Sequence, residues 1–182
     1  MSKIDIFNTD KKYNIIYADP PWHYDFGKSS SRFVGDKYKL MKIEELANLP
    51  IKSIVDDNAV LLIWATFPRI NYALETIKNW GFKYKTCAFT WVKQYKKSDK
   101  LFMGNGYYTR SNAEICLLAT KGKPLKRFRH NVHSVIISHI EEHSKKPHEA
   151  RERIVQLFGD VPRIELFARQ HVEGWDCWGN EV

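Results

Sequence analysis

The chain alternates between short apolar runs and longer amphipathic segments. Residues 13–17 ("YNIIY") and 59–66 ("AVLLIWAT") are continuous apolar runs, which are typical of strands buried on both faces. Pro68 can begin a helix that runs up to Trp80, and Gly81 can end it. The other expected elements are helices at 43–51 and 145–159 and strands at 82–93, 113–122, 132–139 and 163–168.

Because strands alternate with helices, the sequence predicts an α/β fold with a mainly parallel central sheet and helices on both faces. A length of 182 residues suits one domain, and we expect residues 1–182 to form it. Ligands of such sheets bind at the carboxyl ends of strands. Asp19 and the segment after Phe167 both follow expected strands, so we expect a site between them.

Composition favours a packed protein of the cytoplasm. Hydrophobic residues make up 43% of the chain, and no apolar run approaches the roughly 20 residues of a membrane helix. The first ten residues lack the apolar stretch of a secretory signal. We therefore expect no membrane contact. Three distant cysteines without CxxC spacing, and histidines 139, 143 and 148 without a supporting ligand pattern, predict neither a disulfide framework nor a metal site.

Positive charge predicts a polyanionic partner. The formal net charge is +8, which fits nucleic acid but also fits a solvated basic face. Two basic clusters stand out, "KQYKK" at 93–97 and "KGKPLKRFRH" at 121–130. We interpret the second cluster as a nucleic-acid surface.

The first strand runs into an acid, two prolines and a tryptophan, Asp19, Pro20, Pro21 and Trp22. Prolines cannot donate to a strand ladder, and they hold the turn and its carbonyls in fixed directions. With the Asp19 carboxylate they form a rigid cluster of hydrogen-bond acceptors, which complements an exocyclic amine on a base. Stacking of that base on Trp22 would contribute about 1–3 kcal/mol. The structural alternative is a proline-capped strand with a core tryptophan.

Four stretches in this order, "YADPPW", "KKPHEARERIVQLF", "RIELFAR" and "GWDCWGNE", resemble the MT-A70 family of adenine N6-methyltransferases. The resemblance runs from about residue 5 to residue 181, and the compact chain looks more like the prokaryotic and phage members. It implies a Rossmann-like methyltransferase that uses S-adenosylmethionine and has a permuted motif order. The catalytic "DPPW" then precedes the cofactor-binding segments.

The resemblance also implies roles for individual residues. In the catalytic motif these are Asp19, Pro20, Pro21 and Trp22. Toward the cofactor, Asp5 and Ile6 match the pair that binds adenine, Lys146 matches the lysine that pairs with the methionyl carboxylate, and Asp19 lies near the methionyl amine. Phe167 and Arg169 match positions that line the pocket and its ribose, with His171 beside them, and Asn180 and Glu181 match the pair that holds the ribose and adenine edges. As a bland alternative, Glu165 and Arg169 form a surface ion pair.

On the substrate side, Tyr38 aligns with a tyrosine of the family, and Trp22 is expected to stack on the base. The stretch "GNGYYTRSNAE" combines Tyr108 and Arg110, which suit base stacking and phosphate contact, with Glu114, a candidate for the edge of the target adenine. The alternative for this stretch is a glycine hairpin with exposed tyrosines.

The function that follows is methyl transfer from S-adenosylmethionine to N6 of adenine in DNA. The same reaction on RNA adenosine is the main alternative. A catalytically silent nucleic-acid-binding partner subunit is another alternative, which the intact Asp19 argues against. Cytosine N4 methylation ranks low, because such enzymes more often carry serine in place of Asp19. A homodimer or heterodimer is compatible with this function.

Overall fold

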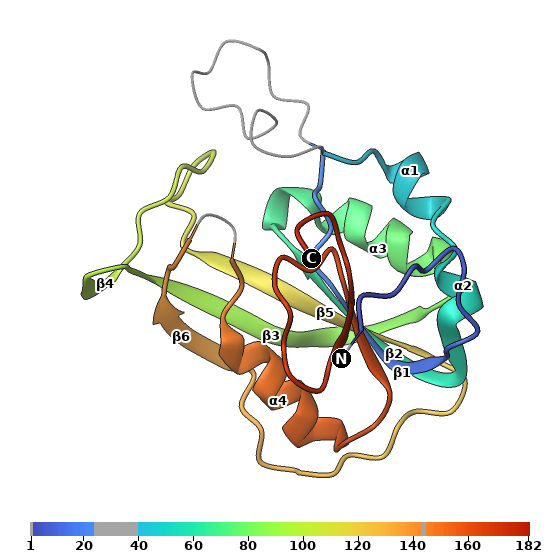
Figure 1. Ribbon diagram of the computed structural model, residues 1–182. Coiled ribbons are helices and arrows are strands. Elements are labelled where there is room, and N and C mark those ends of the chain that lie inside the picture. Colours follow the sequence, from blue (N-terminus) through green and yellow to red (C-terminus); the bar gives the residue numbers. More distant parts are fainter. Residues whose placement is uncertain (1, 24–39, 143–144) are drawn as a thin grey trace.

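A single eight-stranded sheet runs through the described part of the chain (Figure 1). The structure is a computed structural model, which describes residues 2–23, 40–142 and 145–182. The strands follow the order β4-β3-β5-β2-β1-β7-β8, and β6 pairs with β3. Their bounds are β1 Tyr13–Ala18, β2 Val55–Ala65, β3 Lys83–Tyr95, β4 Ser98–Leu101, β5 Ala113–Lys121, β6 Val135–His139, β7 Arg163–Leu166 and β8 Asp176–Trp178.

The sheet is mixed, so the prediction of a mainly parallel sheet holds only in part. Strands β2, β1, β7 and β8 are parallel neighbours, and β6 is parallel to β3. In contrast, β5 runs antiparallel to both β2 and β3, and β4 runs antiparallel to β3. The reason is the connection from β3 to β5, which contains only β4 and a glycine-rich turn. Without a crossover helix the chain returns in the opposite direction.

Helices cover both faces of the sheet, as predicted. Their bounds are α1 Ile43–Ala47, α2 Ile51–Ile54, the short 3-10 helix η2 Phe67–Arg69, α3 Ile70–Asn79 and α4 His148–Phe158. The expected helix at 43–51 is thus two short helices, with Pro50 directly before the second. In Figure 1, α1, α2 and α3 lie behind the sheet and α4 lies in front.

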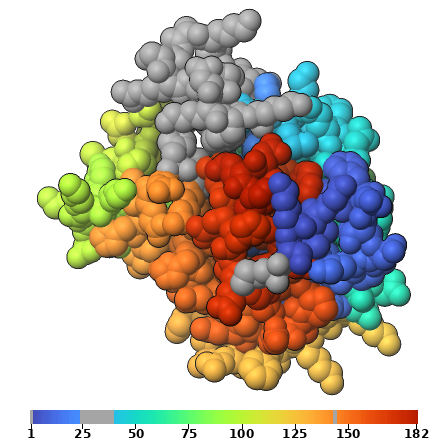
Figure 2. Space-filling model, viewed as in Figure 1, coloured from blue at the N-terminus to red at the C-terminus, as the bar shows by residue number. Residues whose placement is uncertain are grey.

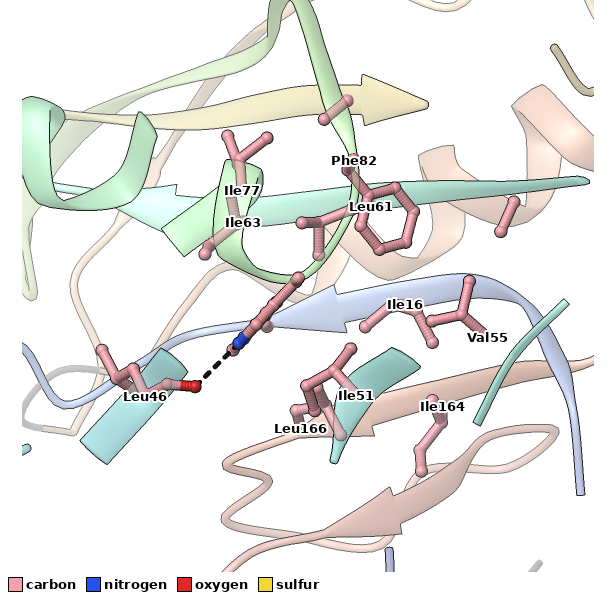
Figure 3. Packing of buried hydrophobic residues seen from close by; sticks show 14 of the residues in the cluster. Ile16, Leu46, Ile51, Val55, Leu61, Ile63, Ile77, Phe82, Ile164 and Leu166 are labelled. Atoms are coloured by element: carbon pink, nitrogen blue, oxygen red, sulfur yellow. Dashed lines mark hydrogen bonds between the residues drawn. The ribbon is translucent and has the colours of Figure 1, made fainter. Parts of the chain in front are cut away.

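Each face of the sheet has its own hydrophobic core. Side chains alternate along β1, so Ile16 packs with the α1–α3 layer and Tyr17 packs with α4. Figure 3 shows the first core, in which the Trp80 indole donates a hydrogen bond of 2.8 Å to the Leu46 carbonyl. In the second core, Ile154 of α4 packs among the buried side chains of the sheet. Two covered faces leave the strand ends as the open edges of the sheet.

None of the helices in residues 2–23, 40–142 and 145–182 is both long and apolar enough to cross a membrane.

Candidate active site

Asp19 lies at the carboxyl edge of the parallel half of the sheet. It directly follows β1, and the register pairs Ala18 with Leu166, the last residue of β7. Asp19 and Phe167 therefore leave neighbouring strands side by side, as the sequence predicts. Pro20 and Pro21 direct the chain away from the ladder, and the Pro21 carbonyl accepts the Met41 N–H at 2.8 Å.

Four charged side chains from separate elements form a connected network at this edge. The Lys146 ammonium lies 2.7 Å from a carboxylate oxygen of Asp19 and 3.3 Å from one of Glu114. The other oxygen of Glu114 accepts a short hydrogen bond from Lys93. These groups are largely buried, with 10% of the Lys146 side chain, 23% of Asp19 and 14% of Glu114 exposed. The network brings Asp19, Lys146 and Glu114 together, all three expected from the sequence.

The protonation of the network follows from burial and from the paired charges. Burial raises the pKa of the Asp19 carboxyl, and the nearby Lys146 ammonium offsets only part of that rise. For Glu114, burial also acts to raise the pKa, but Lys146 and Lys93 together bring it below its ordinary value. Burial acts to lower the pKa of Lys146, and the two carboxylates outweigh it, so the pKa is raised and the lysine is cationic. Asp19 is thus the more basic carboxylate of the pair.

A cavity of about 550 Å³ opens beside Asp19. Its walls come from the turn after β1 and from the segments that follow β7 and β8. The Phe167 and Trp178 rings meet edge to face at 5.4 Å, and Arg169 lies 3.6 Å from Glu181. The residues that line it are Asp19, Pro21, Met41, Phe167, Ala168, Arg169, Trp178, Gly179, Asn180 and Glu181.

Two backbone features shape this cavity. Phe167 is the only residue other than glycine with a positive φ, 61°, among those the structure describes. Such a conformation is rarely adopted by large side chains, and it turns the chain sharply after β7. A Cβ on Gly179 would lie 2.2 Å from the Ala168 carbonyl oxygen, so only glycine lets the "WGNE" segment pack against this turn.

Three residues expected at the cofactor do not line this cavity. The Asp5 carboxylate accepts the Phe7 N–H at 3.0 Å, and the Ile6 side chain is buried in the first core. The segment does come near the aromatic wall, because the Phe7 ring lies 6.3 Å from Trp178. His171 has its Nδ1 3.3 Å from the Cys177 sulfur. Tertiary packing thus gives these three residues structural contacts in place of the expected binding positions.

Trp22 is buried, with only 6% of its surface exposed. Its indole N–H donates to the Trp64 carbonyl at 3.1 Å, and its backbone forms a bridge with Met41. This bridge folds Trp22 into the first core. The structure corresponds to the alternative of a core tryptophan and does not provide the open stacking surface that we expected. The Pro20 carbonyl accepts the Trp22 N–H at 2.9 Å, which leaves its second lone pair for another donor.

The expected substrate-side residues divide into two groups. Glu114 belongs to the charged network, whereas Tyr108 and Arg110 are exposed on a hairpin that the Gly104 and Ser111 backbones close. This is the glycine hairpin with exposed tyrosines that we gave as the alternative. A Cβ on Gly104 would lie 2.3 Å from the Ser111 carbonyl oxygen, which explains the glycine. Tyr38 lies outside the described residues.

Sequence reasoning missed two parts of the site. Lys93 sits in the "KQYKK" cluster, where it reads as a surface cation; only the pairing of β3 with β5 brings it to Glu114. Arg151 of α4 donates two hydrogen bonds, of 2.7 and 2.6 Å, to Glu165 of β7. Both are buried, so Glu165 pairs with Arg151 and not, as the bland alternative supposed, with Arg169 at the surface. A glutamate inside the apolar run "RIELF" was the available signal.

The second basic cluster lies away from this site. Strand β5 begins next to Glu114 and ends at Lys121, whose partner Ala59 lies on the first half of β2. Residues 121–130 therefore follow the opposite edge of the sheet, below α4 in Figure 1. The expectation of a nucleic-acid surface next to the catalytic residues is wrong in its location, because the apolar pattern of β5 does not reveal its direction.

No group of three histidine, cysteine, aspartate or glutamate side chains that could hold a metal ion occurs within the described residues.

Comparison with known proteins gives the same family as the four motifs. The MT-A70 family profile matches residues 13–181. The Type II methyltransferase M.MunI of a Mycoplasma species is 37% identical, over 94% of this chain and 78% of that protein. An N(6)-adenosine-methyltransferase MT-A70-like protein of Arabidopsis thaliana is 27% identical over 99% of this chain, which spans only 25% of that relative. The human N(6)-adenine-specific methyltransferase METTL4 is 26% identical, over 97% of this chain and 39% of that protein. The chain belongs to the MT-A70 family and is an adenine methyltransferase.

Proposed function

We propose that the protein transfers a methyl group from S-adenosylmethionine to the exocyclic N6 of adenine in DNA. The observation that carries this proposal is the Asp19 carboxylate, which stands at the wall of a cavity of about 550 Å³ and contacts Lys146. DNA is favoured because the most similar relative given above is the bacterial Type II methyltransferase.

The residues of the cavity fit the chemical groups of S-adenosylmethionine. Lys146 offers a cation for a carboxylate, and Asp19 offers an acceptor for an ammonium. Phe167 and Trp178 give an aromatic wall for a purine, and Asn180 and Glu181 give polar groups for a ribose. When bound, this cofactor supplies an electrophilic methyl group on a positively charged sulfur.

Lys146 is suited to couple the two binding events. Its ammonium neutralises Asp19 and Glu114 at the same time, so a carboxylate that binds Lys146 competes with both. An Asp19 oxygen that loses this partner becomes free to accept a hydrogen bond from an amine N–H. The coupling favours binding of the nucleic acid after the cofactor.

Asp19 then acts on the amine of the base. The nitrogen lone pair of an exocyclic amine is conjugated with the ring and is a weak nucleophile. Hydrogen bonds from its two N–H groups to Asp19 and to the second lone pair of the Pro20 carbonyl favour a tetrahedral nitrogen and aim its lone pair. The raised pKa of Asp19 strengthens it as an acceptor.

The test is to incubate the pure protein with methyl-labelled S-adenosylmethionine and separate DNA and RNA pools, and to digest each pool to nucleosides. The proposal predicts label in N6-methyladenine from DNA. Label in N4-methylcytosine, or cofactor binding without any methyl transfer, contradicts it.

RNA adenosine is the second candidate substrate. Relatives named N6-methyladenosine RNA methyltransferase MTA1 occur in Pyricularia oryzae and Cryphonectria parasitica, at 24% and 26% identity over most of this chain. In the same experiment this candidate predicts the label in the RNA pool.

A further inference from the structure

The segment 121–140 carries cations and no acid. It contains Lys121, Lys123, Lys126, Arg127 and Arg129, with no aspartate or glutamate in its twenty residues. The Lys121 ammonium is used internally, because it donates to the Val55 and Asp56 carbonyls. The other four side chains are exposed, and their charged groups make no ion pair or hydrogen bond with any described residue. We call residues 123–130 the basic loop.

The ends of the basic loop are fixed to the body of the protein. Leu125 and Val132 pack against the second core, and the Phe128 N–H donates to the Leu157 carbonyl of α4 at 2.6 Å. Arg153 of α4 donates to the carbonyls of His133 and Val135, both at 2.7 Å. The cations between these anchors therefore project from a defined surface next to the end of α4.

An aromatic ring stands among these cations. Phe128, between Arg127 and Arg129, is 71% exposed. Its ring lies against Gly159, at the end of α4. An exposed ring flanked by cations suits a nucleic acid, since the ring can stack on a base while the cations contact phosphates.

The basic loop is too far from Asp19 to bind the methylated nucleotide. Glu114, at the site, and Lys121, at the start of the loop, are seven residues apart on β5, which corresponds to about 24 Å at about 3.4 Å per residue. Figure 2 shows the segment in light orange along the lower edge, below α4 and away from the C-terminal segment that lines the cavity. A strand that occupies both places must extend well beyond the target base.

We propose that the basic loop binds the phosphate backbone of a nucleic-acid segment that flanks the methylated one. The inference rests on the proposed function for its partner. It separates two tasks, because the site edge holds the target adenine and the opposite edge anchors the rest of the strand. The loop then sets the affinity for long substrates and leaves the chemical step unchanged.

The test compares the variant Lys126→Glu/Arg127→Glu with the control Lys52→Glu/Lys78→Glu. The control makes the same charge change at exposed positions on α2 and α3. Both are assayed on a six-nucleotide and a forty-nucleotide single-stranded DNA with the same target.

For the loop variant we expect KM for the long DNA to rise on the order of tenfold and its log–log salt slope to become shallower by about 2. We expect kcat and the short DNA to be unaffected, and the control to match the wild type. An equal rise for both lengths, an unchanged KM for the long DNA, or the same rise in the control overturns the inference.

A binding measurement separates this inference from the proposed function. Fluorescence anisotropy with the two DNAs needs no methyl transfer. If the wild type prefers the long DNA and the loop variant loses that preference, the basic loop is the anchor even if another base is methylated. If the preference stays intact in the variant, this inference fails while the proposed function stands. Phe128→Ala should lower the affinity for the long DNA without changing the salt slope.

Discussion

Lys146 and Lys126 carry the same ammonium group at opposite edges of one sheet, and their surroundings differ in two respects. Lys146 is nearly buried and contacts two carboxylates, whereas Lys126 is exposed and has no partner among the described residues. A buried charge must be compensated within the fold, so Lys146 is tied to groups that can do chemistry. An exposed, unpaired cluster of like charges instead favours a partner that carries the opposite charge. Equal net charge thus serves reaction at one edge and attraction at the other.

Removing the ammonium at the site edge should have the largest effect. Lys146→Met leaves Asp19 and Glu114 without their shared cation, and it removes a partner for the cofactor carboxylate. We expect kcat/KM to fall by about 10²–10³ or more. Lys145→Met is the matched control, because Lys145 pairs with Glu141 and should leave kcat/KM within about threefold of the wild type. Comparable losses in the two variants would contradict a special role for Lys146.

The buried ion pair beneath the site should matter for stability. Arg151→Met leaves the buried Glu165 carboxylate uncompensated, and we expect the free energy of unfolding to fall by about 3–5 kcal/mol. The double variant Arg151→Met/Glu165→Met removes both charges and should recover most of this loss. Urea denaturation of both variants measures it. A double variant no more stable than the single one would show that the pair is not an isolated charge problem.

The exposed hairpin at the site edge provides a third comparison. Tyr108 is fully exposed, and stacking on a base contributes about 1–3 kcal/mol. Tyr108→Ala should therefore raise KM for nucleic acid by about 5- to 150-fold, converted from that range, with cofactor affinity unchanged. Tyr84→Ala is the control, because Tyr84 is a partly exposed tyrosine near the start of β3, at the other end of that strand. An unchanged KM for Tyr108→Ala would remove the hairpin from the substrate site.

The smallest expected effect is a shift in pH dependence. Asp19 must be ionised to accept the amine hydrogens, and burial raises its pKa above the ordinary 3.8, so the acid limb of kcat/KM should lie above pH 3.8. The Glu114 charge contributes to that rise. Glu114→Gln removes this contribution, so the pKa of Asp19 should fall and the acid limb should move to lower pH. A limb that moves to higher pH would mean that another group controls it.

The sequence was informative wherever the local pattern decides the structure. Strand-ending positions placed Asp19 and Phe167 at one edge, and helical periodicity predicted α4 and the cover on both faces. It was uninformative wherever the direction of a strand or a distant partner decides. The antiparallel course of β5 brought Lys93 to Glu114 and carried the basic loop to the far edge. Likewise, the partner of Glu165 is fourteen residues away on α4, which no local pattern indicates.

The central claim is that the Asp19 carboxylate holds the amine of the target base during methyl transfer. Single-turnover methylation by Asp19→Ala, at saturating cofactor and nucleic acid, tests it most directly. The account predicts a rate lower by about 10²–10³ or more, with an unchanged circular dichroism spectrum and cofactor binding that can still be saturated. A rate equal to that of the wild type would contradict it.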